Sequence, residues 1–312
     1  MKKIINNKIV LILLLLLTLT GCTTQLRDKD NKIVKNPTTG QNLTANIVCK
    51  PTDKEIIKIY EKNKVKIEKL PDCNKMSITG KYENLWNTFF VRPLAYIIVR
   101  VGKLVGNTGL ALILITLAIR LVLFPITRKT AMQSELIKKA QPELNKLEKK
   151  YEGKTDQDSI TKKGQEMMMI YKKYNINPLS GCVFAFLQLP LLFAFIEAIN
   201  RVPAIFEGKF IGLEMGMTPW VGITSGNYLY IILPILIIVT TYFSFNMNNT
   251  ASMQNAAQNK SMMIFMTIFI GFMSFTLSSA IGIYWVTSSA FTVFQNLLTD
   301  RSIKNEKRSN KR

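Results

Sequence analysis

The chain has 312 residues, of which 48% are hydrophobic, and a formal net charge of +21. The hydrophobic residues form long runs, which is typical of a protein that crosses a membrane several times and excludes an ordinary soluble enzyme. Histidine is absent and the chain has no nucleotide-binding glycine motif, so we expect no enzymatic reaction, no cofactor and no metal site.

Residues 1–21 have the pattern of a lipoprotein signal peptide. A basic start with Lys8 is followed by an apolar core, 9–17, which is too short to span a bilayer comfortably. Leu19–Cys22 reads Leu-Thr-Gly-Cys and resembles the bacterial lipoprotein box, which implies cleavage before Cys22 and lipid on its sulfur. The alternative is a free cysteine after an uncleaved anchor. In both cases the following residues begin outside the cytoplasm.

Residues 22–84 are rich in Lys, Asn, Thr and Asp, which predicts an extracytoplasmic tether with at most one short helix near 54–69. Its lysines do not conflict with the positive-inside rule, because that rule weakens for segments beyond about 60 residues. Cys49 and Cys73 either form a disulfide in that oxidising space or remain two free thiols.

Residues 85–105 predict an amphipathic helix that lies in the outer membrane interface, with Trp86 as an anchor. A sixth span is the alternative, but Arg92, Arg100 and Lys103 lie along the segment and disfavour it. Apolar residues recur at helical spacing: Leu85, Trp86, Phe89, Phe90, Leu94, Ile97, Ile98, Val101, Leu104 and Val105.

Five apolar segments are long enough to span a bilayer: 109–127, 178–199, 228–246, 262–278 and 280–298. The connection 128–175 carries twelve basic residues and the tail 301–312 carries six, so both belong in the cytosol. We therefore expect a multi-pass protein of the bacterial cell membrane, with its mature N-terminus outside and lipid-anchored and its C-terminus cytoplasmic. The fold class is all-α.

Arg120 lies inside the first predicted span, where a guanidinium costs about 2.5 to 3.5 kcal/mol on insertion scales. Such a residue normally faces a partner or a watery cavity, which indicates a functional role. The alternative is snorkelling, because the side chain could reach several ångströms towards the cytosolic end. Glu197 falls near the outer end of its own span, so we expect it to be too far away to pair with Arg120.

The segment 128–175 predicts a cytosolic helical hairpin that turns at Gly153–Asp158. The methionines 167–169 are either a soft surface for apolar segments or ordinary core residues. Two apolar stripes define the facing sides of the hairpin: Met132, Leu136, Ala140, Leu144, Leu147 and Tyr151, and then Ile160, Met167, Tyr171 and Tyr174.

Three stretches carry a resemblance to a known family. Leu117–Thr127, followed by a charged helix, resembles the first core span of the YidC-type membrane protein insertases. Asn177–Pro190 is similar to that family's second span, and Gly282–Trp285 with Gln295 is similar to its last span. The lipoprotein start with five spans resembles the monoderm-bacterial branch. Departures from the family pattern occur at Phe184, Ser278–Ala280 and Ser289.

The resemblance implies an insertase and foldase that needs no nucleotide, with five spans around a hydrophilic groove. The groove would be open to the cytosol and the lipid, closed to the outside, and positively charged through Arg120. Its clients would be nascent membrane proteins; the ribosome and the Sec translocon are candidate partners, membrane lipids surround it, and DNA is not a partner. The residues that would bind clients in the groove are Arg120, Gln188, Leu189, Pro190, Trp285 and Gln295.

Two other functions compete with this interpretation. A small-solute or ion transporter could use Arg120 as a substrate site, but such proteins usually contain internal repeats, and none is visible among the five spans. A structural lipoprotein scaffold would leave Arg120 unexplained. The basic tail 301–312 either binds ribosomal RNA through its phosphates or only fixes the topology.

Overall fold

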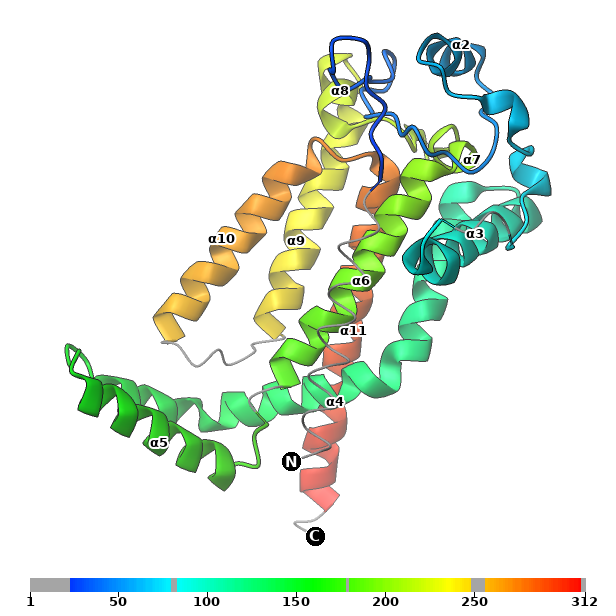
Figure 1. Ribbon diagram of the computed structural model, residues 1–312. Coiled ribbons are helices and arrows are strands. Elements are labelled where there is room, and N and C mark those ends of the chain that lie inside the picture. The colour runs from blue at the N-terminus through cyan, green and yellow to red at the C-terminus, as the bar shows by residue number, and fades with distance from the viewer. Residues whose placement is uncertain (1–22, 80–82, 178–179, 248–255, 310–312) are drawn as a thin grey trace. The chain divides into compact units, whose positions relative to one another are not determined.

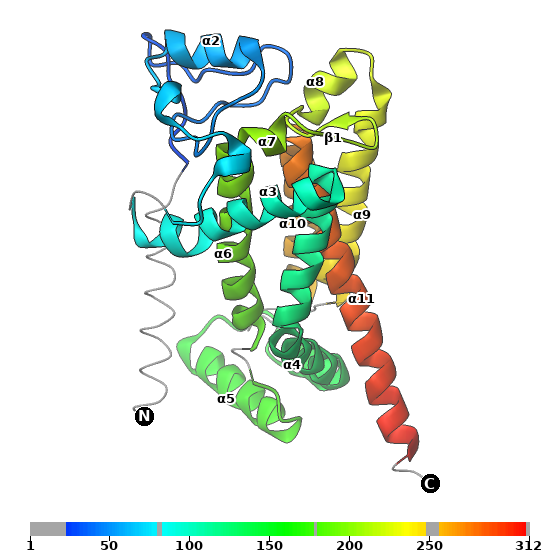
Figure 2. The same ribbon diagram turned by 90° about the vertical axis from the view of Figure 1, so that its right-hand side faces the viewer.

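The computed structural model describes residues 23–79, 83–177, 180–247 and 256–309, so Cys22 and the signal segment lie outside the described residues. The described chain is mostly helical (Figures 1 and 2). Its elements are α2 Lys54–Lys62, η1 Ile67–Lys69, η2 Cys73–Lys75, η3 Asn87–Val91, α3 Arg92–Val105, α4 Thr108–Lys150, α5 Gln157–Lys173, α6 Ser180–Arg201, α7 Pro203–Phe206, β1 Lys209–Phe210, β2 Leu213–Glu214, α8 Pro219–Thr224, η4 Tyr228–Ile231, α9 Ile232–Met247, α10 Ala256–Ser274 and α11 Ser279–Ser309.

The chain divides into two compact units, and each of the long helices α4, α6, α9, α10 and α11 contributes to both. Unit 1 contains Met1–Ile119, Phe186–Ile237 and Ile270–Ser288. Unit 2 contains Arg120–Ala185, Ile238–Phe269 and Ser289–Arg312.

Unit 1 is built around an apolar core to which α3, α4, α6, α9 and α11 all contribute. Phe195 of α6 stacks on Tyr284 of α11 with ring centroids 4.1 Å apart, and both side chains are fully buried. In Figure 2 α3 runs crosswise to α6, and its residues Leu94 and Ile98 join the same core. Where such helices lie in lipid, close van der Waals packing holds them together, because lipid tails are as apolar as the core itself.

Trp86 is not the interface anchor that we predicted. Its side chain is 0% exposed, and its indole N–H donates to Glu197 Oε1 over 3.2 Å. A buried indole needs an acceptor for its N–H, and Glu197 on α6 supplies one inside the core. The exposed apolar side chains around α3 are Leu85, Phe89, Phe90, Ile97 and Leu104.

The residues after the signal segment fold into a small structure instead of the loose tether that their composition predicts. The helix α2 lies inside the region where one was expected, and Asp53 caps it by accepting from the Glu55 and Ile56 amides. Cys49 and Cys73 form a disulfide, which resolves the open alternative. Six buried side chains form a core of their own: Leu26, Leu43, Ile47, Ile56, Tyr60 and Ile67. Because these residues are scattered among polar ones, composition alone does not reveal them.

Unit 2 contains the hairpin, whose two arms are the second half of α4 and the helix α5. The buried side chains that join the arms are Ile137, Ala140, Leu144, Tyr171 and Ile176. The predicted stripes were wrong at Met132 and Ile160, which are 40% and 53% exposed. Each lies at an end of its stripe, where the opposite arm no longer covers it.

The first predicted span and the first arm of the hairpin are one helix of 43 residues, α4, although we predicted separate elements. Pro125 and Pro142 lie inside it. Each proline removes one backbone hydrogen bond, but the apolar and polar stretches on either side keep the helix continuous. By length and hydropathy, two helical stretches of the described chain can cross a membrane, Thr108–Lys150 and Tyr228–Met247, and Ser261–Ser274 is a shorter apolar helix.

The turn between α10 and α11 contains the sequence Ser278–Ala280, where the chain departs from the family pattern. The Ser279 hydroxyl donates to the Met217 carbonyl oxygen over 2.7 Å, and the Ser279 amide donates to the same oxygen over 2.9 Å. The Ala280 amide donates to the Met215 carbonyl oxygen over 2.9 Å. Ser279 and Ala280 therefore attach the start of α11 to the segment that follows β2.

Candidate functional site

Arg120 is 4% exposed and lies in α4, at the point where unit 2 begins. We therefore compared the buried residues that the spanning helices contribute to unit 2. Outside the hairpin, in 120–127 of α4 and in the described unit 2 parts of α9, α10 and α11, nine buried side chains are polar or charged, and one, Phe291, is apolar. The nine are Arg120, Thr127, Thr241, Ser244, Thr267, Thr292, Gln295, Asn296 and Thr299. The core of unit 1 has the opposite composition.

A direct polar contact joins α4 and α11 in this region. The Thr127 hydroxyl donates to Gln295 Oε1 over 2.8 Å, and both side chains are less than 5% exposed. A hydroxyl in a helix commonly bonds to its own backbone, and Thr127 Oγ1 also lies 3.2 Å from the Leu123 carbonyl oxygen. This bond holds the Gln295 side chain in one orientation. Because 168 residues separate Gln295 from Thr127 in the chain, the sequence alone does not predict the contact.

The other predicted groove residues lie in unit 1. Leu189 of α6 is 45% exposed, Gln188 and Pro190 beside it are half-buried, and Trp285 of α11 is half-buried. Pro190 lies inside α6 and leaves the carbonyl oxygen one turn earlier without its usual helical donor. Leu191 and Trp285 both pack against the apolar core of unit 1. The six predicted residues therefore fall into two groups, with Arg120 and Gln295 in unit 2 and the remainder in unit 1.

The hairpin is joined by two similar polar clusters, each centred on a glutamate. Glu143 Oε1 accepts from Lys173 Nζ at 2.5 Å and from the Tyr174 hydroxyl at 2.8 Å. Glu166 Oε1 accepts in the same way from Lys150 at 2.6 Å and from Tyr151 at 2.8 Å. Hydrogen bonding to the lysine is the largest cause that lowers the pKa of each carboxyl group below its ordinary value, and the bond from the tyrosine comes next.

These pKa shifts predict that acid loosens the hairpin. A carboxyl group whose pKa is lower in the folded state stabilises that state above the unfolded value of 4.5, and the contribution disappears as the pH falls through the folded value. We expect hydrogen-exchange protection factors of α5 to fall as the pH drops from about 5 towards 3. The double variant Glu143→Gln, Glu166→Gln should start lower and change little with pH. Parallel loss of protection in both proteins would contradict this prediction.

The chain is similar to known membrane proteins. Residues 100–307 match the family model described as 60Kd inner membrane protein. The chain is 34% identical over 247 residues to the membrane protein insertase YidC of Oceanobacillus iheyensis, covering 76% of this chain and 93% of that protein. It is also 34% identical over 225 residues to the membrane protein insertase MisCA of Bacillus subtilis, covering 72% of this chain and 82% of that protein.

The chain belongs to the YidC family of membrane protein insertases. A solved structure described as "Active YidC insertase crystal structure with the first transmembrane domain resolved" aligns with a TM-score of 0.46 and 21% identity, over 79% of this chain and 50% of that one. The assignment to the YidC family does not depend on that alignment.

The family match begins at residue 100 and therefore includes Arg120, Gln295 and the hairpin, whereas the folded segment 23–79 precedes it. Sequence reasoning missed two residues of that outer region. Neither Arg201 nor Glu83 was singled out in the sequence, yet they form a salt bridge of 2.7 Å. No local pattern indicates this pair, because Arg201 is the last residue of α6 and Glu83 lies 118 positions earlier.

Proposed function

We propose that the protein inserts transmembrane segments of nascent proteins into the bacterial plasma membrane through a hydrophilic groove, without nucleotide hydrolysis. Five helices, α4, α6, α9, α10 and α11, are proposed to cross the bilayer, with α3 in the outer interface and the hairpin in the cytosol. The groove would contain Arg120, Gln188, Leu189, Pro190, Trp285 and Gln295. Membership of the YidC family supports this function.

The observation that carries the proposal is the polar interior of unit 2 outside the hairpin. Nine of the ten buried side chains in 120–127 and in the described unit 2 parts of α9, α10 and α11 are polar or charged, and one of them is Arg120. Helices in lipid gain nothing from burying polar groups unless these groups bond to one another or to a polar guest. Such an interior would lower the barrier for a polar client tail, which is the unfavourable part of insertion.

The apolar part of a client needs no further driving force. Burying each CH₂ group of a transmembrane segment in lipid is favourable by about 0.8 kcal/mol, so a segment of roughly 20 residues enters spontaneously once its tail has crossed. Arg120 would attract an acidic or polar tail into the groove. The segment would then slide past Leu189 and Pro190 into the bilayer. The protein's contribution is therefore electrostatic and geometric, with no covalent step.

The experiment that tests this function uses purified protein in liposomes. A single-span client is synthesised first and is then added to the liposomes without nucleotide. It should become protected from external protease when the liposomes contain the protein. Empty liposomes should give little protection. Equal protection with and without the protein would refute the insertase function, and solute flux that depends on a counter-ion would support a transporter instead.

Cys22 is proposed to carry a lipid, because it follows Leu-Thr-Gly in the manner of a lipoprotein box. We expect metabolic labelling with radioactive palmitate to mark the protein and to disappear in Cys22→Ala. The variants Cys49→Ser and Cys182→Ser are the matched controls and should keep the label. Label that persists in Cys22→Ala would show that Cys22 is not the site.

The basic tail is proposed to contact the ribosome, in addition to fixing the topology. The structure continues α11 as a helix to Ser309, so most of the tail is helical. If the tail binds RNA phosphates, co-sedimentation of the protein with ribosomes should fall steeply as salt rises. Deletion of residues 301–312 should abolish that co-sedimentation at low salt. Unchanged co-sedimentation after the deletion would leave topology as the tail's single role.

A further inference from the structure

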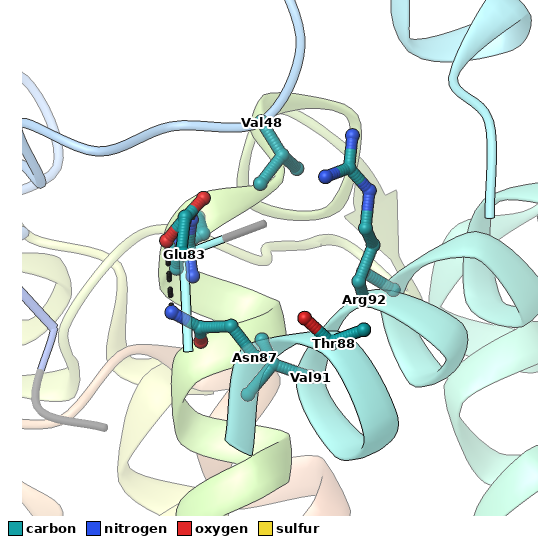
Figure 3. A pocket seen from close by; sticks show the side chains of 8 residues that line it. Val48, Glu83, Asn87, Thr88, Val91 and Arg92 are labelled. Atoms are coloured by element: carbon teal, nitrogen blue, oxygen red, sulfur yellow. Dashed lines mark hydrogen bonds and ion pairs between the residues drawn. The ribbon is translucent and has the colours of Figure 1, made fainter. Parts of the chain in front are cut away.

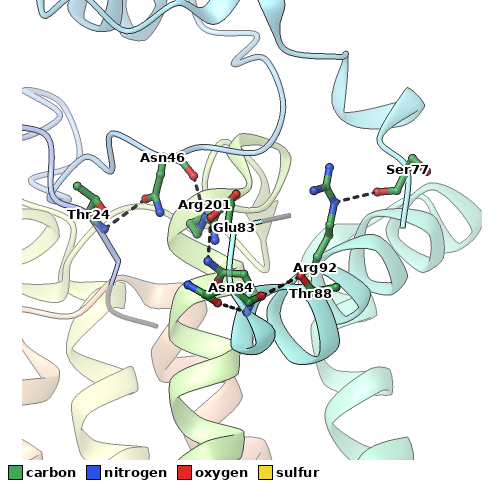
Figure 4. A network of polar contacts seen from close by, with 9 residues as sticks. Thr24, Asn46, Ser77, Glu83, Asn84, Thr88, Arg92 and Arg201 are labelled. Atoms are coloured by element: carbon green, nitrogen blue, oxygen red, sulfur yellow. Dashed lines mark hydrogen bonds and ion pairs between the residues drawn. The ribbon is translucent and has the colours of Figure 1, made fainter. Parts of the chain in front are cut away.

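A segment of the folded outer region, Thr39–Asp53, runs along the end of α6, and we name it the strap. Its central contact is Arg201, whose side chain is 2% exposed. The Arg201 Nε donates to the Asn46 carbonyl oxygen over 2.8 Å (Figure 4). The Arg201 carbonyl oxygen accepts from the Val48 amide at 2.9 Å. Arg201 therefore bonds to the strap through both its side chain and its backbone.

The same guanidinium fixes the segment that leads into α3. Arg201 Nη2 donates to Glu83 Oε1 at 2.7 Å and to Oε2 at 2.9 Å, and Glu83 Oε2 also accepts from Asn87 Nδ2 at 2.8 Å. Figure 3 shows the small pocket between Val48, Glu83 and Asn87, and its volume is about 10 Å³, room for a single water molecule. The end of α6, the strap and the start of η3 are thus packed closely around one buried charge.

Both ends of the strap are also attached to the connection between α6 and α9. At one end Glu207 accepts from the Thr52 amide at 3.0 Å, from the Thr52 hydroxyl at 2.5 Å and from the Asp53 amide at 3.2 Å. At the other end the Thr39 carbonyl oxygen accepts from the Thr218 amide at 3.0 Å. Gly40, next to Thr39, has φ +72°, a conformation that favours glycine.

The strap belongs to the core of unit 1 as well as to its surface. Val48 and Cys49 are buried in the same apolar cluster as the residues of α3, α4, α6, α9 and α11, and Cys49 is 0% exposed. The disulfide from Cys49 to Cys73 spans 24 residues and closes the chain around this point. Closing a loop of this length restricts the unfolded segment and favours the docked one.

We propose that the strap closes the extracytoplasmic end of unit 1, and that the Cys49–Cys73 disulfide keeps it closed during insertion. The inference rests on the proposed function, because an insertion route that opens to the cytosol and the lipid requires a barrier on the outer side. The strap provides one by tying the end of α6, the connection to α9 and the start of η3 to a single buried segment. It precedes the residues that the family model matches, so this barrier is a property of this chain's own N-terminal region.

The test uses the full chain in liposomes that contain a pH-sensitive dye. Three openings of the strap are compared with the unmodified protein: reduction with dithiothreitol, the double variant Cys49→Ser, Cys73→Ser, and Glu207→Ala. We expect at least tenfold faster hydrogen exchange at the Val48, Thr52 and Thr218 amides and a several-fold faster proton leak after an acid jump. Insertion of a single-span client should be retained. Glu214→Ala is the matched control, because Glu214 pairs with Lys209 in the same connection and does not bond to the strap.

The possible outcomes distinguish a failure of the strap proposal from a failure of the proposed insertase function. Dithiothreitol should have no effect on the double cysteine variant, which identifies the disulfide as its target. An unchanged proton leak in all three opened forms would overturn the barrier role, even if exchange accelerates. Failure of the unmodified protein to insert the client would refute the proposed function while the exchange and leak measurements still decide whether the strap closes the outer end.

Discussion

Replacing Arg120 by alanine should remove most of the insertion of a single-span client with an acidic extracellular tail, whereas Arg120→Lys should retain it. The reason is charge: at 4 Å and an effective dielectric constant near 20, a pair of unit charges attracts by about 4 kcal/mol whatever the shape of the donor. If only a third of that attraction acts on the client, its loss lowers insertion about tenfold. Arg120→Glu should abolish insertion, because it repels the acidic tail.

A structural role for Arg120 predicts a different order among the variants. Arginine forms bidentate and stacked contacts that lysine reproduces poorly, so a structural arginine would make Arg120→Lys as damaging to folded yield as Arg120→Ala. Membrane-integrated protein and client insertion should therefore be measured together for the three variants. Thr127→Val is a useful control, since it removes the hydroxyl that bonds to Gln295 and leaves the charge in place. Normal insertion by Arg120→Ala at normal protein level would contradict the charge mechanism.

Gly282→Val should strongly reduce the amount of folded protein, because α11 packs directly against Leu233 of α9 at Gly282. A Cβ added at this position would lie 2.6 Å from Leu233 Cδ2 and 2.9 Å from Leu233 Cγ. Leu233 is 5% exposed and belongs to the apolar core, so its side chain has little room to move. Overpacking of a close-packed core costs about 1 to 3 kcal/mol, and valine adds more than the first carbon. Thermal unfolding in detergent, followed by size-exclusion fluorescence, measures the effect.

Gly164→Ala is the matched control for this prediction. Gly164 lies inside α5, and nothing lies within 4 Å of the position that its Cβ would occupy. Alanine in a helix interior is more favourable than glycine by about 0.5 to 1 kcal/mol, so this change should stabilise the hairpin slightly. Equal loss of folded protein in both variants would show that the close approach of α9 and α11 at Gly282 is not the cause.

The apolar helices and the protein family could be predicted from the sequence, because each is indicated by a continuous stretch of residues. Runs of apolar residues define α9 and the first half of α4, and the stretch Leu117–Thr127 carries the resemblance that family membership confirms. Contacts between distant residues were not accessible. The bonds from Arg201 to Asn46 and Glu83 join residues separated by 155 and 118 positions, and no local pattern links them.

The candidate site was only partly predictable for the same reason. Arg120 and Gln295 stand out as polar residues in apolar segments, but the seven other polar side chains buried in unit 2 outside the hairpin are mostly serines and threonines. These residues are common in spanning helices and bond to their own backbone, so their type does not reveal on which side of the helix they lie. Only the burial of these side chains in the structure shows that they belong to one polar region.

The continuity of α4 has a mechanical consequence. At 1.5 Å per residue its 43 residues give roughly 65 Å of helical path, with Arg120 in its first third and the hairpin arm at its end, and the helix bends along this path (Figure 1). Because the backbone stays helical through the bend, we expect a displacement of the hairpin arm to be passed on to the stretch that carries Arg120. Pro125, five residues after Arg120, is the compliant joint of this path, because the helix lacks one hydrogen bond there. We therefore expect docking of a large partner on the hairpin to shift the charge of Arg120 without any chemical signal.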